Sequence, residues 1–333
     1  MKMEKLISII IVNWNGLRYL DECISSLINQ TYQNFEIILV DNASSDESVS
    51  FVRNTFPKVQ IIKNDANFGF AKGVNIGIEH SSGEYIALFN QDAVAEKNWL
   101  ITLLKILDSS EKIAAVTGKV YYYGNNYGDN TIFCTWSKID PFSAFPYNYN
   151  NDEPSAEVDY LSGCAFLTKR EIIKEVGLLD SGYFLYFEET DWCARMIRAG
   201  YSLVYVPDAI VWHVVSSSIK NYEIKENYMV RNRFRFAIKN FDRLYIPIFL
   251  AIFFTETLVE FAKSVKNKNF VNFKIRIKSV HWNCKNLRVT LNARRKDQSQ
   301  LRITRSYNKS LPLKVYPIGL VEKLFAIIRS HSR

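Results

Sequence analysis

The chain has 333 residues, a mass of 38.7 kDa and 48% hydrophobic residues. This length and composition predict one large domain with a buried core plus a smaller part, and they exclude a disordered chain. The five cysteines include no C-x-x-C pair, which argues against a disulfide framework or a thiolate zinc site and favours a reducing cytoplasm. They are Cys23, Cys134, Cys164, Cys193 and Cys284.

The net charge of +8 is unevenly distributed along the chain. Residues 263–333 contain 18 Lys and Arg but 2 Asp and Glu, whereas residues 1–262 contain 24 and 32. Such a basic segment favours a polyanion, either nucleic acid or an anionic membrane surface. Because aromatic residues are sparse in it and no recognition motif occurs, we favour the membrane and expect no nucleic acid partner.

The first elements are predicted from hydrophobic periodicity. Residues 6–12, LISIIIV, predict a buried strand, because the apolar run is short and lacks the small-residue cleavage site of a signal peptide. The next segment, residues 19–30, has helical spacing. Its apolar face is expected to contain Leu20, Ile24, Leu27 and Ile28.

The alternation of strands and helices continues to about residue 120. Strands are predicted at 35–40, 59–63 and 84–90, with a helix at 70–80. Another helix is expected to begin in DNASSDES, where Ser44 and Glu47 have the spacing of a capping box. Strands that are apolar throughout and connected by helices predict a mainly parallel α/β sheet.

Polar residues follow several of these strands. Asn13, Asp41 and the group 90–92 lie at strand ends, and ligands of parallel α/β sheets bind beyond the carboxyl ends of the strands. The glycines of NFGFAKGVNIG are spaced one helical turn apart, which lets a helix approach the sheet or a ligand closely. They are Gly69, Gly73 and Gly77.

The remainder of the chain divides into three parts. Residues 121–159 predict a long excursion over the site, residues 160–213 return to the α/β pattern, and helices follow from about 220. The apolar run 244–254 is shorter than the roughly 20 residues of a bilayer span, so a buried or interfacial helix is expected. The last helix could also contact a membrane, with Leu320, Leu324, Ile327 and Ile328 on one face.

Three carboxylates occur within four positions, at Glu188, Glu189 and Asp191. Crowded carboxylates repel one another and lose hydration when buried, which favours a role with a cation, a proton or a substrate hydroxyl. Acidic residues in a first turn also complement the helix dipole, and this segment predicts a helix that ends at Gly200. These residues alone leave both interpretations open.

Asp92 and His213 each follow or end an apolar strand. Either residue alone is typical of an ordinary turn or a structural histidine. Together, a carboxylate and an imidazole suit a divalent ion whose remaining ligands are diphosphate oxygens and water.

Three stretches of the sequence resemble the family 2 glycosyltransferases of the GT-A fold, in particular their bacterial rhamnosyltransferase-like branch. They are SIIIVNWNGLRYLDECISSLINQTYQNFEIILVDNASSDES, NFGFAKGVNIGIEHSSGEYIALFNQDA and GLLDSGYFLYFEETDWCARMIRAGYSLVYVPDAIVWH. The resemblance covers residues 6–240 except 121–157. It implies a GT-A domain at 1–220, with a mainly parallel sheet flanked by helices, and a basic helical region at 221–333 for membrane association.

The resemblance also implies site residues. Those that bind the nucleotide are Val12, Asn13, Asp41, Asn67, Gly69 and Asn75. FNQDA occupies the DXD-type motif with Asn90 in place of the first aspartate, so Asp92 and His213 would hold Mn²⁺ or Mg²⁺. Glu189 would be the general base where aspartate is usual. Those expected beside it are Glu188 and Asp191, which shape the acceptor pocket or hold its loop, and Ser162 and Gly163, next to the donor sugar and acceptor.

The function implied is an inverting, metal-dependent glycosyltransferase on the inner face of the cell membrane. The branch favours dTDP-rhamnose, with UDP-galactose, UDP-glucose or an N-acetylhexosamine donor as alternatives. The acceptor would be a bacterial surface glycan, such as O-antigen or capsule, as a lipid-linked oligosaccharide.

Other classes of protein remain to be tested. A non-catalytic glycan-binding or scaffolding subunit could keep the same fold. A nucleotidyltransferase is disfavoured because the first loop offers only Gly16 and Arg18 for a triphosphate. A dehydrogenase is disfavoured because its glycine fingerprint is missing after the first strand.

Overall fold

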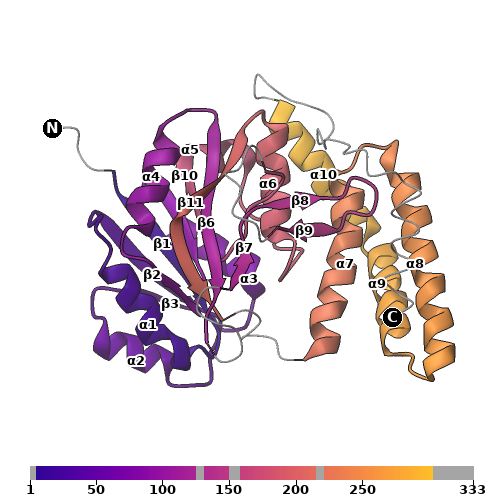
Figure 1. Ribbon diagram of the computed structural model, residues 1–333, viewed down its shortest axis with the longest axis horizontal. Helices are drawn as coiled ribbons and strands as arrows, with labels where there is room; N and C mark the ends of the chain where they lie inside the picture. The colour runs from indigo at the N-terminus through magenta and orange to yellow at the C-terminus, as the bar shows by residue number, and fades with distance from the viewer. Residues whose placement is uncertain (1–4, 125–130, 150–157, 215–220, 303–333) are drawn as a thin grey trace.

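A computed structural model describes residues 5–124, 131–149, 158–214 and 221–302 (Figure 1). A nine-stranded sheet runs through the α/β part in the order β3-β2-β1-β4-β10-β6-β11-β5, and β7 pairs with β6. The strands of this sheet are β1 (Ile7–Asn13), β2 (Phe35–Asp41), β3 (Gln60–Lys63), β4 (Tyr85–Phe89), β5 (Ala93–Ala95), β6 (Ile113–Tyr122), β7 (Ile132–Cys134), β10 (Ala165–Lys169) and β11 (Ser202–His213).

The sheet is mainly parallel, as predicted. The pairs β1–β2, β2–β3, β1–β4 and β6–β11 are parallel, whereas β10 runs antiparallel to β4 and β6. Strands β5 and β7 are antiparallel to their neighbours. The carboxyl ends of six strands therefore meet at one edge, where the polar residues of the sequence were expected to gather.

Helices cover both faces of the sheet (Figure 1). One core contains α1 (Leu17–Ile28), α2 (Ser48–Thr55) and α4 (Trp99–Asp108). The other contains α3 (Gly69–Glu79), α5 (Arg170–Val176), α6 (Glu188–Arg198) and parts of the C-terminal helices. Strand β1 alternates between the two cores, with Ile9 and Ile11 in the first and Ile10 in the second, so every isoleucine of the strand is buried.

Two expectations for the first helices are wrong. Ile28 is 42% exposed, and Cys23 takes its place on the buried face of α1. Helix α2 begins at Ser48, and no side chain caps it. The Ser44 hydroxyl instead accepts hydrogen bonds from the side chain of Asn13 and the backbone of Asn15, because the loop belongs to the polar edge of the sheet.

The glycines of α3 allow the helix to approach the sheet closely. A Cβ atom at Gly73 would lie 2.8 Å from Cγ1 of Val12, and one at Gly77 would overlap Ile10. The spacing predicted this close approach to the sheet.

The segment expected to be an excursion contains short strands where the structure describes it. Strands β8 (Ser137–Ile139) and β9 (Pro146–Asn148) form a separate two-stranded sheet. Trp136 stacks on Tyr149 beside it, with ring centroids 3.7 Å apart. The connection between β8 and β9 brings Phe145 to the cavity described below.

The C-terminal region is helical, as predicted. It consists of α7 (Tyr222–Asn240), α8 (Tyr245–Asn267), α9 (Val271–Lys285) and α10 (Leu287–Arg302). Helix α8 extends well beyond the apolar run 244–254, and by length and composition alone it could cross a membrane. The amphipathic segment with Leu320, Leu324, Ile327 and Ile328 lies outside the described residues.

Candidate functional site

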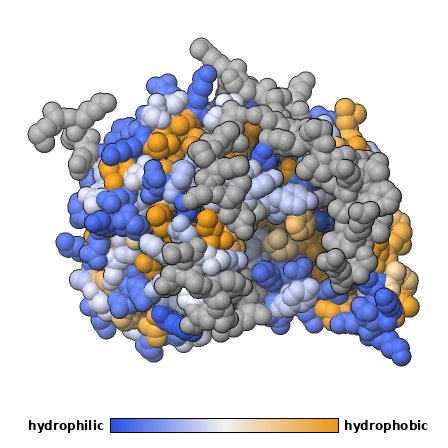
Figure 2. All heavy atoms as spheres, viewed as in Figure 1, coloured by the Kyte–Doolittle hydropathy of each residue, from blue (hydrophilic) through white to orange (hydrophobic). Residues whose placement is uncertain are grey.

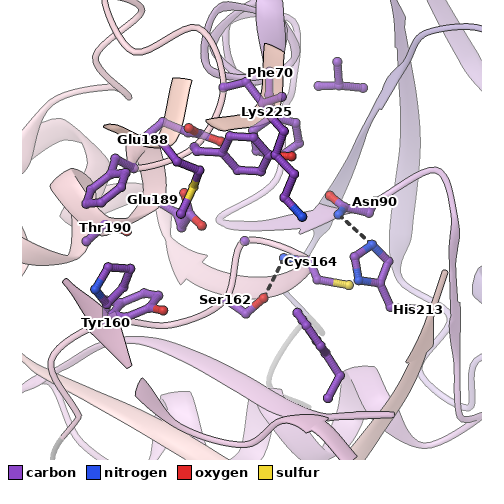
Figure 3. Close-up of a pocket in the computed structure, with 18 of the residues that line it drawn as sticks. Phe70, Asn90, Tyr160, Ser162, Cys164, Glu188, Glu189, Thr190, His213 and Lys225 are labelled. Carbon is purple, nitrogen blue, oxygen red and sulfur yellow. Dashed lines mark hydrogen bonds between the residues drawn. The ribbon is translucent and has the colours of Figure 1, made fainter. Parts of the chain in front are cut away.

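A cavity of about 410 Å³ lies at the carboxyl edge of the sheet, a size typical of small-ligand sites (Figure 3). Its walls come from the end of β1, the loop after β4, the loop before β10, the end of β11 and the first turns of α6 and α7. The cavity brings together seven of the predicted site residues. They are Val12, Asp92, Ser162, Gly163, Glu188, Glu189 and His213.

One wall carries the predicted metal ligands. The Nε2 atom of His213 lies 3.1 Å from Oδ1 of Asp92 and 3.2 Å from Nδ2 of Asn90, and all three residues line the cavity. Burial lowers the pKa of His213, but the neighbouring Cys164 and Asp92 raise it by more, so the net shift of this pKa is upward.

This arrangement fits a divalent cation. Two polar groups converge on one imidazole nitrogen, and a cation between Asp92 and His213 would use both a carboxylate oxygen and a nitrogen lone pair. Within the described ranges, no group of three or more His, Cys, Asp or Glu side chains could hold a metal.

The opposite wall carries the acidic pair of α6 (Figure 3). Burial raises the pKa of Glu189 to about 6, although the backbone N–H groups of Glu189, Thr190 and Gly163 hydrogen bond to its carboxylate and oppose that rise. Burial and the charge of Glu189 raise the pKa of Glu188 further. The Oε2 atoms of both residues are buried without a hydrogen-bond partner. The three backbone hydrogen bonds favour the charged form of Glu189, so this carboxylate is suited to accept a proton.

A strained loop positions this pair. Phe184, Tyr186 and Phe187 have φ angles of 67°, 67° and 73°, in the left-handed region that side chains rarely adopt. The side-chain amide of Asn232 on α7 donates to the carbonyl oxygens of Tyr183, Leu185 and Tyr186. Such strain persists only where surrounding contacts enforce it, and it is concentrated at functional sites.

Asp191 does not line the cavity, which corrects its expected place in the acceptor pocket. It is fully buried behind the acidic pair and lies 2.9 Å from Nζ of Lys239 and 3.1 Å from Nε of Arg195. Burial alone would raise its pKa, but Lys239 and Arg195 lower it below the usual range. The alternative role, holding the loop and helix, agrees with these contacts.

Asn13 and Asp41 lie next to the cavity rather than in its lining. They are opposite each other in the β1–β2 register, and Nδ2 of Asn13 donates to Oδ1 of Asp41 at 2.8 Å and to Oγ of Ser48 at 2.9 Å. Gln91, which does line the cavity, accepts a hydrogen bond from the backbone N–H of Trp14. Gln91 therefore connects the cavity to this buried polar cluster.

The other three predicted nucleotide residues lie in α3 or just before it. Asn67 accepts a hydrogen bond from the Gly69 N–H, and the Asn75 amide exchanges hydrogen bonds with the backbone of Leu179. Gly69 has a φ of 81°, and a Cβ there would lie 2.5 Å from the carbonyl oxygen of Phe184. These residues do not line the cavity; they connect α3 to the strained loop.

The sequence prediction missed the contribution of α7. Lys225 and Met229 line the cavity, and Lys225 extends into it from the side of the acidic pair (Figure 3). Their spacing of four residues places them on one face of a helix, which is the signal that could have identified them. The site thus draws on residues on both sides of the expected boundary at 220.

The mixed sheet flanked by helices has the GT-A fold of glycosyltransferases, and its cavity holds a buried carboxylate pair and a carboxylate–imidazole pair at the carboxyl edge of the sheet. Residues 8–177 match the family described as glycosyl transferase family 2. The chain belongs to that family.

Curated relatives are similar over part of the chain. Glycosyltransferase GlyG of Streptococcus pneumoniae is 32% identical over 137 residues, which is 40% of this chain and 45% of the relative. An N-acetylglucosaminyl-diphospho-decaprenol L-rhamnosyltransferase of Mycobacterium tuberculosis is 25% identical over 236 residues, which is 63% of this chain and 76% of the relative. The chain spans 35%, 45% and 36% of the length of the first three curated relatives it matches.

Solved structures show the same fold. The mannosyltransferase PcManGT from Pyrobaculum calidifontis, in complex with GDP-Man and Mn²⁺, aligns with a TM-score of 0.54 and 15% identity over 92% of this chain and 86% of that one. GalNAc-T7 with UDP, GalNAc and Mn²⁺ aligns with a TM-score of 0.59 and 18% identity over 86% of this chain and 58% of that one.

Proposed function

We propose that the chain is a metal-dependent inverting glycosyltransferase with Glu189 as its general base. One observation carries this proposal: a single cavity holds the ionisable Glu189 on one wall and the Asp92–His213 pair on the other (Figure 3). A donor diphosphate at the second wall would leave its sugar between the two.

The reaction then follows from proton transfer at Glu189. Its carboxylate accepts the proton of an acceptor hydroxyl, whose oxygen forms a bond to the anomeric carbon while the bond from that carbon to the diphosphate oxygen breaks. Attack opposite the leaving group inverts the anomeric centre. Asp92 and His213 would hold Mn²⁺ or Mg²⁺, which would supply positive charge to balance that of the diphosphate.

The remaining site residues have proposed roles that match their positions. Ser162, Gly163 and Glu188 contact the donor sugar or the acceptor from the cavity wall. Val12 contacts the nucleotide, and the buried pair of Asn13 and Asp41 recognises the base next to it. Three residues in α3 or just before it act indirectly, because they hold the loop that closes over the nucleotide. They are Asn67, Gly69 and Asn75.

We propose dTDP-rhamnose as the favoured donor, with a UDP-hexose as the alternative. The name of the mycobacterial relative supports both a rhamnosyl donor and a lipid-linked acceptor. The product would be a bacterial surface glycan made on the cytoplasmic face of the membrane, with residues 1–220 carrying most of the chemistry and 221–333 the attachment.

Thermal unfolding with dTDP, UDP or GDP, with and without Mn²⁺, tests the donor site, because a ligand of the native state raises the melting temperature. We expect a shift with dTDP that depends on Mn²⁺. Asp92→Asn and His213→Gln should weaken this dependence by about tenfold or more. His80→Gln, at an exposed histidine, is the matched control. No shift with any nucleotide would support a non-catalytic subunit instead.

A further inference from the structure

Helix α8 carries a stripe of exposed apolar side chains on its outer face. The stripe follows helical spacing and consists of Leu250, Phe254, Leu258, Phe261 and Val265, which are between 40% and 64% exposed. Hydrophobic surface is visible along the edge of the molecule where α8 lies (Figure 2). A contiguous apolar face of this kind marks a surface that meets a partner or a membrane.

The inner face of the same helix is packed into the protein. Phe249 and Phe253 are buried and contact the ring of Phe234 on α7. Glu256 forms ion pairs with Arg233 at one side and Arg276 on α9 at the other. A membrane-spanning α8 would have to break these contacts, so the helix is built to lie along a surface.

Positive charge borders the apolar stripe. Residues 262–285 contain seven Lys and Arg and no Asp or Glu. Lys266 and Lys268 are exposed at the end of α8, and Lys274 and Lys278 are exposed on α9 next to the half-exposed Ile277. An apolar face with a basic border fits an anionic lipid surface, which takes up the apolar side chains and attracts the lysines.

The first half of α8 is close to the mouth of the cavity. Phe145 lines the cavity and is itself exposed, and the guanidinium of Arg233 lies 5.7 Å from its ring while pairing with Glu256 of α8. The ring of Phe142, in the same connection, lies 5.9 Å from that of Tyr245 at the start of α8. A surface bound by α8 would therefore meet the aromatic rim of the cavity.

We propose that the outer face of α8, with its basic border on α9, docks in the plane of an anionic lipid bilayer and presents the cavity mouth to an acceptor carried in that bilayer. The docking surface is inferred from the exposed apolar stripe and from the basic residues that border it. Only the last step, delivery of a lipid-linked acceptor, rests on the proposed function.

Vesicle flotation with the full chain tests the surface, using phosphatidylcholine vesicles with and without phosphatidylglycerol. The wild-type protein should float only with the anionic vesicles. The double variant F254Q/L258Q should bind about tenfold or more weakly, since two apolar side chains lose their burial in the bilayer. The double variant K266Q/K268Q should also bind more weakly, most clearly at low salt. Ile28→Gln, at a similarly exposed residue on α1, should bind like wild type.

Three results would overturn the docking surface: no flotation of the wild type, equal flotation of F254Q/L258Q, or a dimer that only this variant dissociates. A truncation after residue 302 distinguishes vesicle binding by α8 from binding by the tail. If the truncated protein, which keeps the α8 stripe, no longer floats, binding is assigned to residues 303–333 instead. Nucleotide-dependent melting of each variant is measured in parallel. If the protein floats but no nucleotide changes its melting temperature, the proposed function is wrong and the docking surface is retained. If nucleotides raise the melting temperature but the protein does not float, only the docking surface is wrong.

Discussion

The side-chain amide of Asn232 donates a hydrogen bond of 2.8 Å to the carbonyl oxygen of Tyr186, two residues before the acidic pair. It also donates to the carbonyl oxygens of Tyr183 and Leu185. One fully buried side chain of α7 thus holds the backbone that sets the start of α6. The position of Glu189 in the cavity depends on this contact between segments about 45 residues apart.

Asn232→Ala should lower both the stability and the turnover of the enzyme. It removes the Asn232 donor from the carbonyl oxygens of Leu185 and Tyr186, while that of Tyr183 keeps its hydrogen bond from Arg231; this costs about 2 kcal/mol of unfolding free energy and frees the strained loop. Urea unfolding and kcat measure the two effects. Asn283→Ala is the matched control, because Asn283 is a buried amide that donates to carbonyls of Arg231 and Ser279 in the same helical layer. Equal kcat values for the two folded variants would contradict the positioning role of Asn232.

Local patterns predicted the sheet well because its strands are apolar throughout and its crossovers have helical spacing. They also paired Asp92 with His213, and the family resemblance, not a local pattern, added Glu189 to the same site; all three line the cavity at this edge of the sheet. Asn232 was missed because it acts through tertiary contacts that have no local pattern, whereas the four-residue spacing of Lys225 and Met229 marks one helix face but does not show that this face meets the cavity.

Two wrong expectations about polar side chains, one before α2 and one on α6, have related causes. Ser44 has the spacing of a cap, but its hydroxyl is engaged by Asn13 and Asn15, so a contact from another strand replaced the local one. Asp191 has the sequence position of a site residue, yet its partners Lys239 and Arg195 hold it in the interior. Basic side chains elsewhere in the chain therefore determine which carboxylate of the acidic cluster is drawn into the interior and which ones face the cavity.

The acidic pair predicts a specific pH profile. Because burial raises the pKa of Glu189 to about 6, the base is protonated and inactive below that pH, and kcat/KM should rise tenfold per pH unit until it levels off above about pH 6. Glu189→Gln should lower kcat by about 10² to 10⁴ while nucleotide binding persists.

Glu188→Gln separates the roles of the two carboxyls. Burial and the charge of Glu189 raise the pKa of Glu188, which favours its neutral form, and glutamine imitates that neutral form. This variant should keep an acid limb near pH 6 and most of its activity. If Glu188→Gln were the inactive member and Glu189→Gln the active one, the assignment of the base would be reversed.

Asp191→Asn should destabilise the protein without directly removing a group from the cavity. Lys239 would keep Asp180 and Asp297 as partners, but the buried Arg195 would lose its nearest carboxylate, a change that costs about 3 kcal/mol. Since these cations lower the pKa of Asp191, its contribution is present above the unfolded-state pKa of about 4 and is lost as pH falls through the lower folded value. Urea unfolding at neutral and acidic pH measures this difference. Asp21→Asn, at an exposed carboxylate of α1, should have little effect at either pH.

Lys225 provides the last prediction, because its side chain extends into the cavity toward the wall that holds Asn90 and His213 (Figure 3). A donor diphosphate on that wall would bring anionic oxygens within reach of the ammonium group. Lys225→Gln should therefore raise the KM for the donor by about tenfold or more, the value of one charge-assisted hydrogen bond. Lys225→Arg should recover much of the loss, since it keeps the charge, whereas the exposed Lys97→Gln should change nothing. If Lys225→Gln left the donor KM unchanged and raised the acceptor KM instead, the lysine would contact the acceptor. Binding of the donor diphosphate would then depend on the Asp92–His213 wall and not on Lys225.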